Sequence, residues 1–357
     1  MFVGGEFYYD SEWVSPTPTL STAGMYFLNG GKACLLVIGE YLRDHGIDKI
    51  LLPAYLCPSI LAAFDHCGLA YGFYEVNTDL SINLADLSKK VDGYRAVYFI
   101  NYFGFLQALP ARNYLRSLRQ NGLMLVEDNA QAGFSAHPIG DFVFNSLRKL
   151  APYDGGYLIT RLGVDAYLEK YRDQPNRRLA VIRDYRRGLY RYLFEGQGSH
   201  KTLTEMFELA ERYYEEDFSV VGDPQERANI EQLDWPGIRQ ARRENYRYLL
   251  EKIAPISEIS VIFPALQEDN LPLGLPVYFN GASRDLVYEE LGQAGIGLTI
   301  HWEATRDDPR TNANRQAVDM AGRMLTLVID QRTGRKQLDY LAENLARSVE
   351  NAKTKGK

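Results

Sequence analysis

Residues 95–132 read RAVYFINYFGFLQALPARNYLRSLRQNGLMLVEDNAQA, and this stretch decides the fold. Its first nine residues are almost all apolar and rich in aromatic and β-branched types, which is typical of a strand buried on both faces. Residues 111–120 predict a helix, and residues 123–128 predict a second strand that ends in two acids. Two buried strands joined by a helix indicate a βαβ unit, and hence an open α/β sheet.

The same alternation extends toward the N-terminus, and the character of the chain then changes after residue 165. Before this stretch the pattern predicts helices at 31–45 and 58–68 and strands at 48–56 and 71–76. From about 165 to 250 the sequence is charged and helical, and strand-like pieces return after residue 260, including residues 297–302. We therefore expect a large domain over 1–235, with its helical segment at about 165–235, and a small C-terminal domain over 236–357.

Composition narrows the classes of function. The chain has 357 residues, with 46% hydrophobic and 24% charged, as in ordinary globular proteins. Its formal net charge of −6 argues against a general nucleic-acid binder. Three cysteines without a CxxC pair and five scattered histidines favour neither a disulfide framework nor a metal site. With no apolar run long enough to span a bilayer and no secretory pattern, we expect a cytoplasmic protein without membrane or nucleic-acid partners.

Three segments are candidates for the chemistry, because ligands of open α/β sheets gather at the carboxyl ends of the strands. Gly30 and Gly31 open a predicted helix, where free backbone amides can bind a phosphate, although a plain turn would look the same. Asp128 ends a strand and could hold a cationic ring nitrogen, bind a metal or cap a helix. Lys149 follows an apolar segment and is either a surface residue or an amine that forms a Schiff base. Together, the three features are what pyridoxal phosphate requires.

The order and local sequences of these segments resemble those of the DegT/DnrJ/EryC1/StrS aminotransferases, which are fold-type-I pyridoxal-phosphate enzymes. Residues 29–35, NGGKACL, are similar to the family's phosphate loop, and residues 126–132, VEDNAQA, to its EDAAQA signature. The resemblance implies an open, mostly parallel sheet flanked by helices, a smaller C-terminal α+β domain and a homodimer. It also implies an amino donor, Glu or Gln, and a nucleotide-linked keto sugar as the acceptor.

The resemblance also assigns roles to residues of this chain. Asp128 would pair with the pyridinium nitrogen, Gln131 would lie near the ring hydroxyl, and Lys149 would form the Schiff base and later transfer the proton. The remaining predicted cofactor-binding residues are Gly31, Lys32 and Ala33 in the phosphate loop, Ser146 on the phosphate, and Tyr55 stacked on the ring. Where the family often has the stacking aromatic, this chain has Cys57, so Tyr55 is the nearest candidate.

The lysine segment departs from the family pattern. The family usually reads FSFHPTKNLTTGEGG, whereas residues 144–156 read FNSLRKLAPYDGG. Counting back from Gly155 places Arg148 in the lysine position, and counting forward from Gly140 makes Lys149 the nearby amine. A guanidinium is permanently protonated and cannot form a Schiff base, which favours Lys149. Two alternatives remain: a non-transaminating dehydratase or lyase on the same scaffold, and an inactive member that acts as a binding or regulatory protein.

His301 and Trp302 follow a strand-like piece in the expected small domain. They could reach the substrate cleft, and an ordinary pair that packs the domains together is an equal alternative.

Overall fold

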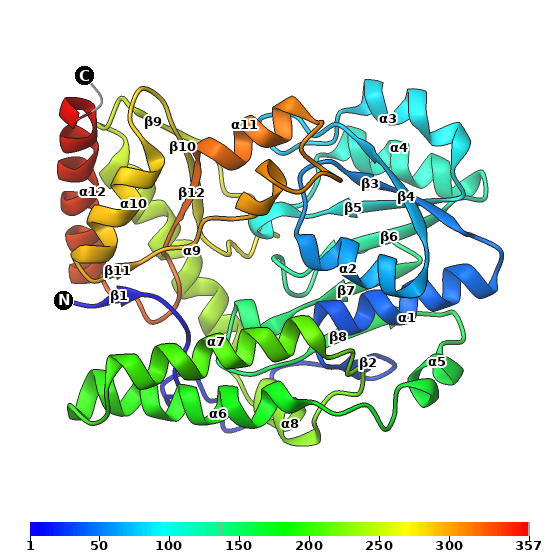
Figure 1. Cartoon of the computed structure of the whole chain (residues 1–357), viewed down its shortest axis with the longest axis horizontal. Helices are drawn as coiled ribbons and strands as arrows, with labels where there is room; N and C mark the ends of the chain where they lie inside the picture. Colours follow the sequence, from blue (N-terminus) through cyan, green and yellow to red (C-terminus); the bar gives the residue numbers. More distant parts are fainter. Residues whose placement is uncertain (136, 356–357) are drawn as a thin grey trace.

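A seven-stranded sheet forms the centre of the computed structural model, which describes residues 1–135 and 137–355 (Figure 1). The strand order is β2-β8-β7-β6-β5-β3-β4. Five neighbouring strands, β7 to β4 in that order, are parallel, and β8 is antiparallel to both β7 and β2. The bounds are β2 Tyr26–Leu28, β3 Lys49–Pro53, β4 Ala70–Tyr74, β5 Ala96–Ile100, β6 Met124–Asn129, β7 Phe142–Asn145 and β8 Gly156–Thr160.

The predicted βαβ unit is present, with β5 and β6 as adjacent parallel strands on either side of α4 (Leu109–Gln120) in the chain. All five residues of β5 are buried, as its apolar run predicts. The other helices of this half are α1 (Gly31–Asp44), α2 (Pro58–Cys67) and α3 (Leu84–Lys90). Helix α1 packs against α2, β7 and β8 and is buried over most of its length, which fixes its N-terminus beside the end of β7.

The segment after β8 is helical, as predicted. It contains α5 (Asp165–Lys170), α6 (Arg177–Tyr190), α7 (His200–Glu216) and α8 (Pro224–Glu231). Helices α6 and α7 pack against each other, and we call residues 177–216 the α6–α7 hairpin. It lies along one end of the molecule, below the sheet in Figure 1.

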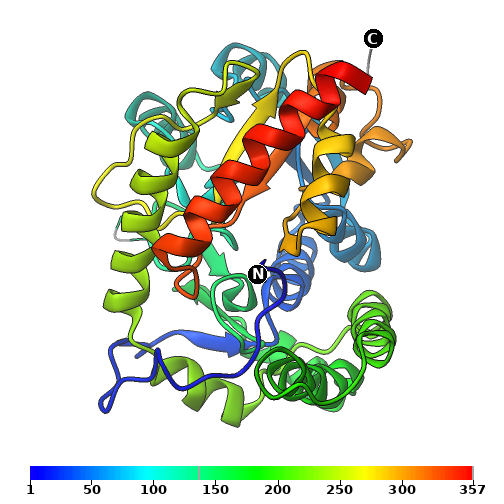
Figure 2. The same cartoon turned by 90° about the vertical axis from the view of Figure 1, so that its left-hand side faces the viewer.

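The C-terminal part begins with α9 (Trp235–Ile253) and contains a three-stranded antiparallel sheet of order β12-β10-β9. Its elements are β9 Ile259–Val261, β10 Leu275–Phe279, α10 Arg284–Gln293, β11 Ile296–Gly297, α11 Arg315–Arg323, β12 Met324–Leu327 and α12 Arg335–Lys355. Figure 2 shows α12 crossing in front of this sheet. Strand β1 (Val3–Gly4) pairs with β11, so the first residues of the chain lie beside the C-terminal elements.

The strand expected over residues 297–302 is largely absent. Only the short β11 and an isolated bridge at Thr299 are present, and the backbone enters the left-handed region at Trp302, with φ of 57°. None of the helices described by the structure is long and apolar enough to cross a membrane.

Candidate active site

An inner cavity of about 50 Å³ lies at the carboxyl ends of the parallel strands. It brings together the three predicted segments: Gly31 and Lys32 at the start of α1, Asp128 and Gln131 after β6, and Ser146 and Lys149 after β7. An outer cleft of about 480 Å³ lies between this region and the C-terminal part. Arg148, Lys149 and Trp302 line both spaces, so Lys149 lies where the two meet.

The two acids at the end of β6 point in different directions, because successive side chains of a strand alternate. Asp128 lines the inner cavity. Glu127 is fully buried, and its Oε2 accepts backbone hydrogen bonds from Ile139 at 2.7 Å and Gly140 at 3.0 Å. Asp128 is therefore available to a ligand, whereas Glu127 holds the loop that leads into β7.

Asp128 is a buried carboxyl group with two donors. Its Oδ2 accepts from the hydroxyl of Tyr98 at 2.5 Å, and its Oδ1 accepts from the backbone N–H of Ala130 at 2.7 Å. Burial raises the pKa of Asp128, and these two hydrogen bonds and the nearby charge of Lys149 oppose that rise. A cationic group placed beside Asp128 would favour its ionised form further.

Lys149 ends the short 3₁₀ turn Leu147–Lys149 that follows β7. Burial lowers the pKa of its amine, and the charge of Arg148 lowers it further, whereas Cys57 and Asp128 act in the opposite direction. Among the described residues, no side chain or carbonyl forms a hydrogen bond or ion pair with its Nζ. An amine of this kind is suited to act as a nucleophile and as a base.

The N-terminus of α1 forms one end of the inner cavity. Its N-cap residue, Gly30, has φ of 108° and no side-chain cap, so the first amides of the helix need an acceptor. Ser146, which is 3% exposed, lies against this turn: a Cβ on Gly31 would be 3.4 Å from the side chains of Phe144 and Ser146. A buried serine thus lies beside a helix N-terminus, an arrangement that favours an anion.

The side-chain amide of Gln131 has a hydrogen-bond partner at its oxygen but not at its nitrogen among the described residues. Its Oε1 accepts from the backbone N–H of Phe103 at 2.9 Å, and its side chain is 2% exposed. Its Nε2 is buried and has no hydrogen-bond partner in the described part of the chain. Because leaving such a donor unpaired costs about 1–3 kcal/mol, it indicates a polar ligand in the cavity.

The side chain of Lys32 does not serve the cavity. Its Nζ donates to the carbonyl oxygens of Tyr214, Glu215 and Asp217, at 2.9, 2.8 and 3.1 Å, where α7 ends. At the N-terminus of α1, Lys32 therefore offers its backbone amide, and its ammonium fixes α7.

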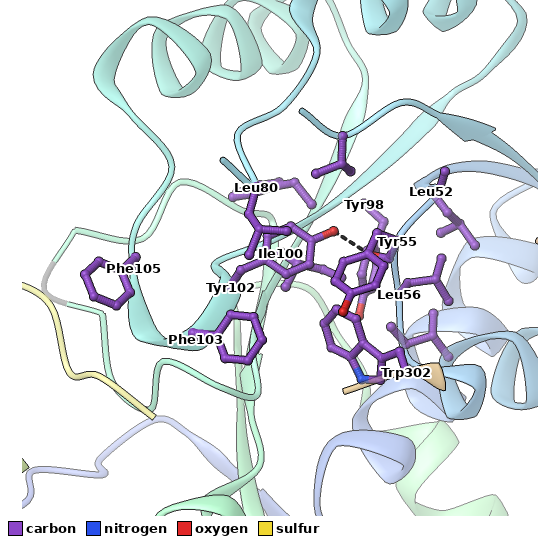
Figure 3. Close-up of a cluster of buried hydrophobic side chains, with 14 of the residues drawn as sticks. Leu52, Tyr55, Leu56, Leu80, Tyr98, Ile100, Tyr102, Phe103, Phe105 and Trp302 are labelled. Carbon is purple, nitrogen blue, oxygen red and sulfur yellow. Dashed lines mark hydrogen bonds between the residues drawn. The ribbon is translucent and has the colours of Figure 1, made fainter. Parts of the chain in front are cut away.

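Tyr55 lies in a buried aromatic cluster (Figure 3). Its hydroxyl donates to the carbonyl of His301 at 3.0 Å, and its ring centroid lies 4.8 Å from that of Trp302. Tyr55 does not line the inner cavity, whereas Cys57 and Trp302 do. Tyr55 therefore packs against Trp302 and does not itself face the inner cavity.

Four residues of the site were missed or left open by sequence reasoning. Tyr98, the partner of Asp128, is a hydroxyl in an otherwise apolar strand, and that pattern could have indicated it. Tyr214 of α7 lines the inner cavity, although nothing in its local sequence distinguishes it from the other tyrosines of the segment. Trp302 and His301, which had two possible roles, both line the outer cleft.

These residues fit pyridoxal phosphate. The amine of Lys149, the carboxyl of Asp128, the Nε2 of Gln131 and the N-terminus of α1 match its aldehyde, ring nitrogen, ring hydroxyl and phosphate.

Sequence comparison alone finds no relatives: no protein-family model matches the chain, and no curated protein does. Solved structures do match. A sugar aminotransferase of Streptococcus pneumoniae, Spr1654 in its PMP form, has a TM-score of 0.68 at 17% identity, over 97% of this chain and 94% of that one. Helicobacter pylori PseC, an aminotransferase involved in the biosynthesis of pseudoaminic acid, has a TM-score of 0.68 at 12% identity, over 92% and 87%.

DesI, solved in the presence of its TDP-sugar product, has a TM-score of 0.66 at 16% identity, over 93% of this chain and 82% of that one. These matches cover the seven-stranded sheet, the helical segment and the small antiparallel sheet together, because they extend over nearly the whole chain. The chain therefore has the fold of the fold-type-I sugar aminotransferases.

Proposed function

We propose that the protein is a pyridoxal-phosphate-dependent aminotransferase, which moves an amino group from Glu or Gln to a nucleotide-linked keto sugar. One observation carries the proposal: Lys149 and Asp128 line the same small cavity, at the uncapped N-terminus of α1. The fold supports it, since PseC is an aminotransferase by its description and DesI was solved in the presence of its TDP-sugar product. A homodimer in the cytoplasm, with domains divided near residue 235, remains part of the proposal.

The cofactor would be held from three sides. The amides of Gly31, Lys32 and Ala33 and the hydroxyl of Ser146 would bind its phosphate. Asp128 would keep the ring nitrogen protonated, and Gln131 would donate to the ring hydroxyl. Tyr55 would act indirectly, by packing against Trp302, which lines the cofactor cavity. When bound, pyridoxal phosphate supplies an electron-accepting ring that stabilises negative charge at the substrate carbon.

Lys149 would carry the proton. Because burial and Arg148 lower the pKa of its amine, a larger fraction of Nζ is unprotonated at neutral pH than in an exposed lysine. Nζ can therefore accept a proton from the carbon that carries the amino group of the donor. It can donate a proton again when the keto acceptor receives the amino group. The outer cleft, which Lys149 also lines, would hold the donor and the keto acceptor in turn.

Titration with pyridoxal phosphate tests the proposal. The wild type and Arg148→Ala at saturating cofactor should develop the yellow absorption band of lysine-bound cofactor, and Lys149→Ala should not. Borohydride reduction and peptide mass spectrometry should then locate the cofactor on Lys149. The absence of the band in the wild type would contradict the proposal and favour the alternative of an inactive binding or regulatory protein.

Adding glutamate separates transamination from the dehydratase or lyase alternative. An aminotransferase converts the bound cofactor into pyridoxamine phosphate and releases 2-oxoglutarate in equal amount. A TDP-linked keto sugar should then restore the yellow form, and an unlinked keto sugar serves as its control. Loss of water from the sugar without amine transfer would favour the alternative.

A further inference from the structure

Arg148 lies between the inner cavity and the outer cleft and is held by α7. Its Cζ lies 4.4 Å from the ring centroid of Tyr214, and its Nη1 lies 3.7 Å from Oε1 of Glu211. Both partners belong to α7, so the α6–α7 hairpin fixes the direction of this guanidinium. The preceding turn of chain starts at Ser146, which lines the same cavity.

Three carboxylates, Glu211, Asp154 and Glu6, act electrostatically on Arg148, and the first two are already engaged by other arginines. Asp154 pairs with Arg178 at 2.7 Å and with Arg186 at 2.6 Å. Glu211 makes its shorter contact, 2.5 Å, with Arg178. Arg148 is therefore the guanidinium of this cluster that makes no hydrogen bond to a carboxylate among the described residues.

The Nε of Arg148 is buried and has no hydrogen-bond partner in the described part of the chain. It shares the inner cavity with the hydroxyl of Ser146 and the start of α1, which are donors that also need an acceptor. Asp128 is the single acid among the residues that line this cavity, and Tyr98 and Ala130 already donate to it. The donors thus outnumber the acceptors, which indicates an anionic ligand with several oxygens.

We propose that Arg148 binds the phosphate group of pyridoxal phosphate, with its Nε as the donor, and that α7 holds it in position through Tyr214 and Glu211. The proposal rests on the proposed function and adds a phosphate ligand at the position before the reactive lysine. A guanidinium suits this role, because it stays charged and presents its N–H groups in a fixed plane.

Comparing two ligands isolates the phosphate. Pyridoxal lacks the phosphate group but carries the same ring and aldehyde. Arg148→Gln should weaken the binding of pyridoxal phosphate about 10- to 100-fold, which is the range for a charge-assisted hydrogen bond, and should leave the binding of pyridoxal unchanged. Both dissociation constants follow from absorption titrations without any turnover.

Further variants separate charge, geometry and position. Arg148→Lys keeps the charge and loses the planar donor, and it should give a smaller loss. Glu211→Gln should also give a small, phosphate-dependent loss, because it removes an anchor of Arg148 on α7. Arg212→Gln, an exposed neighbour on α7, is the control and should change neither constant.

Three results would overturn the proposal. An equal loss for pyridoxal and pyridoxal phosphate would mean that Arg148 acts on Lys149 or on packing. Unchanged binding of both ligands would mean that Arg148 does not bind the cofactor. Unchanged binding of both together with weaker binding of TDP would place Arg148 on the substrate instead.

If the wild type binds neither cofactor form, the proposed function fails, and inorganic phosphate tests Arg148 by itself. Phosphate should then raise the unfolding temperature of the wild type more than that of Arg148→Gln, and equal shifts would overturn the phosphate role.

Discussion

The hydroxyl of Tyr98 donates a hydrogen bond of 2.5 Å to Oδ2 of Asp128, across the neighbouring parallel strands β5 and β6. This bond stabilises the ionised carboxylate, whose pKa is raised by burial. Tyr98 therefore adjusts the ionisation of the one acid that lines the inner cavity.

Tyr98→Phe should impair the reaction most at low pH. Removing the hydroxyl raises the pKa of Asp128 further, so a larger fraction of Asp128 is protonated at any acidic pH and holds the ring nitrogen less well. We expect the rate of the reaction with glutamate to fall about tenfold, corresponding to one hydrogen bond of about 1.4 kcal/mol, and its acidic limb to move to higher pH. A lower rate with an unchanged pH profile would contradict this role.

Glu127 and Asp128 should respond differently to amide substitution. Glu127→Gln replaces an acceptor of two backbone N–H groups with a side chain that can present its own N–H groups to them. We expect the free energy of unfolding in urea to fall by about 2–4 kcal/mol, while the binding of pyridoxal phosphate persists in the folded protein. Asp128→Asn should cost less stability, because it removes a buried charge, and should abolish most of the activity. The reverse order of stability losses would contradict the assignment.

A feature of the fold or of the site can be predicted from the sequence when neighbouring residues encode it. Strands β5 and β6 and helix α4 were predictable, because apolar runs and helical spacing encode them. That Asp128 and Lys149 meet follows from the rule that parallel strands end at one edge. The antiparallel pair β2 and β8 was not predicted as strands, since β2 has three residues and lies at the edge of the sheet.

Long-range contacts of the site carry no local signal. The hydrogen bond from Lys32 to the carbonyl of Tyr214 joins residues 182 positions apart, and the sequence around neither residue indicates the other as its partner. The lysine after two glycines resembled a phosphate ligand for this reason. Tyr55 likewise had the right residue type in the right segment, and its orientation is decided by packing against Trp302.

His301 should make the protein sensitive to mild acid. Its Nδ1 lies 2.8 Å from Oγ1 of Thr326, and burial, with the charge of Lys149, lowers its pKa to about 3. The unfolded state therefore binds a proton below about pH 6.5 that the folded state does not bind, so stability is full above that pH and falls as the pH falls toward 3.

We expect this histidine to remove at most about 1.4 kcal/mol of stability per pH unit below 6.5. Urea unfolding at pH 7 and pH 5 should show a loss in the wild type that is about 2 kcal/mol smaller in His301→Gln. His200→Gln, at an exposed position of α7, is the control. Parallel losses in the wild type and His301→Gln would contradict the prediction.

Lys32→Met should loosen the end of α7. The ammonium of Lys32 serves three carbonyls there and lies 4.2 Å from the ring centroid of Phe218, and methionine keeps the apolar stem without the donor. We expect amides near residues 210–216 to lose hydrogen-exchange protection by about tenfold or more, corresponding to 1.4 kcal/mol or more. Lys201→Met, at the exposed start of α7, should leave that protection unchanged.

The same substitution should speed the loss of cofactor. Tyr214 lines the inner cavity from α7 and supports Arg148, so fraying of this turn opens the cavity and releases the guanidinium together. Pyridoxal phosphate should dissociate faster from Lys32→Met than from Lys201→Met in a competition experiment followed by absorption. Faster exchange at residues 210–216 with an unchanged dissociation rate would mean that α7 does not cover the cofactor. An unchanged exchange rate would mean that packing of Phe218, and not the ammonium, holds the end of the helix.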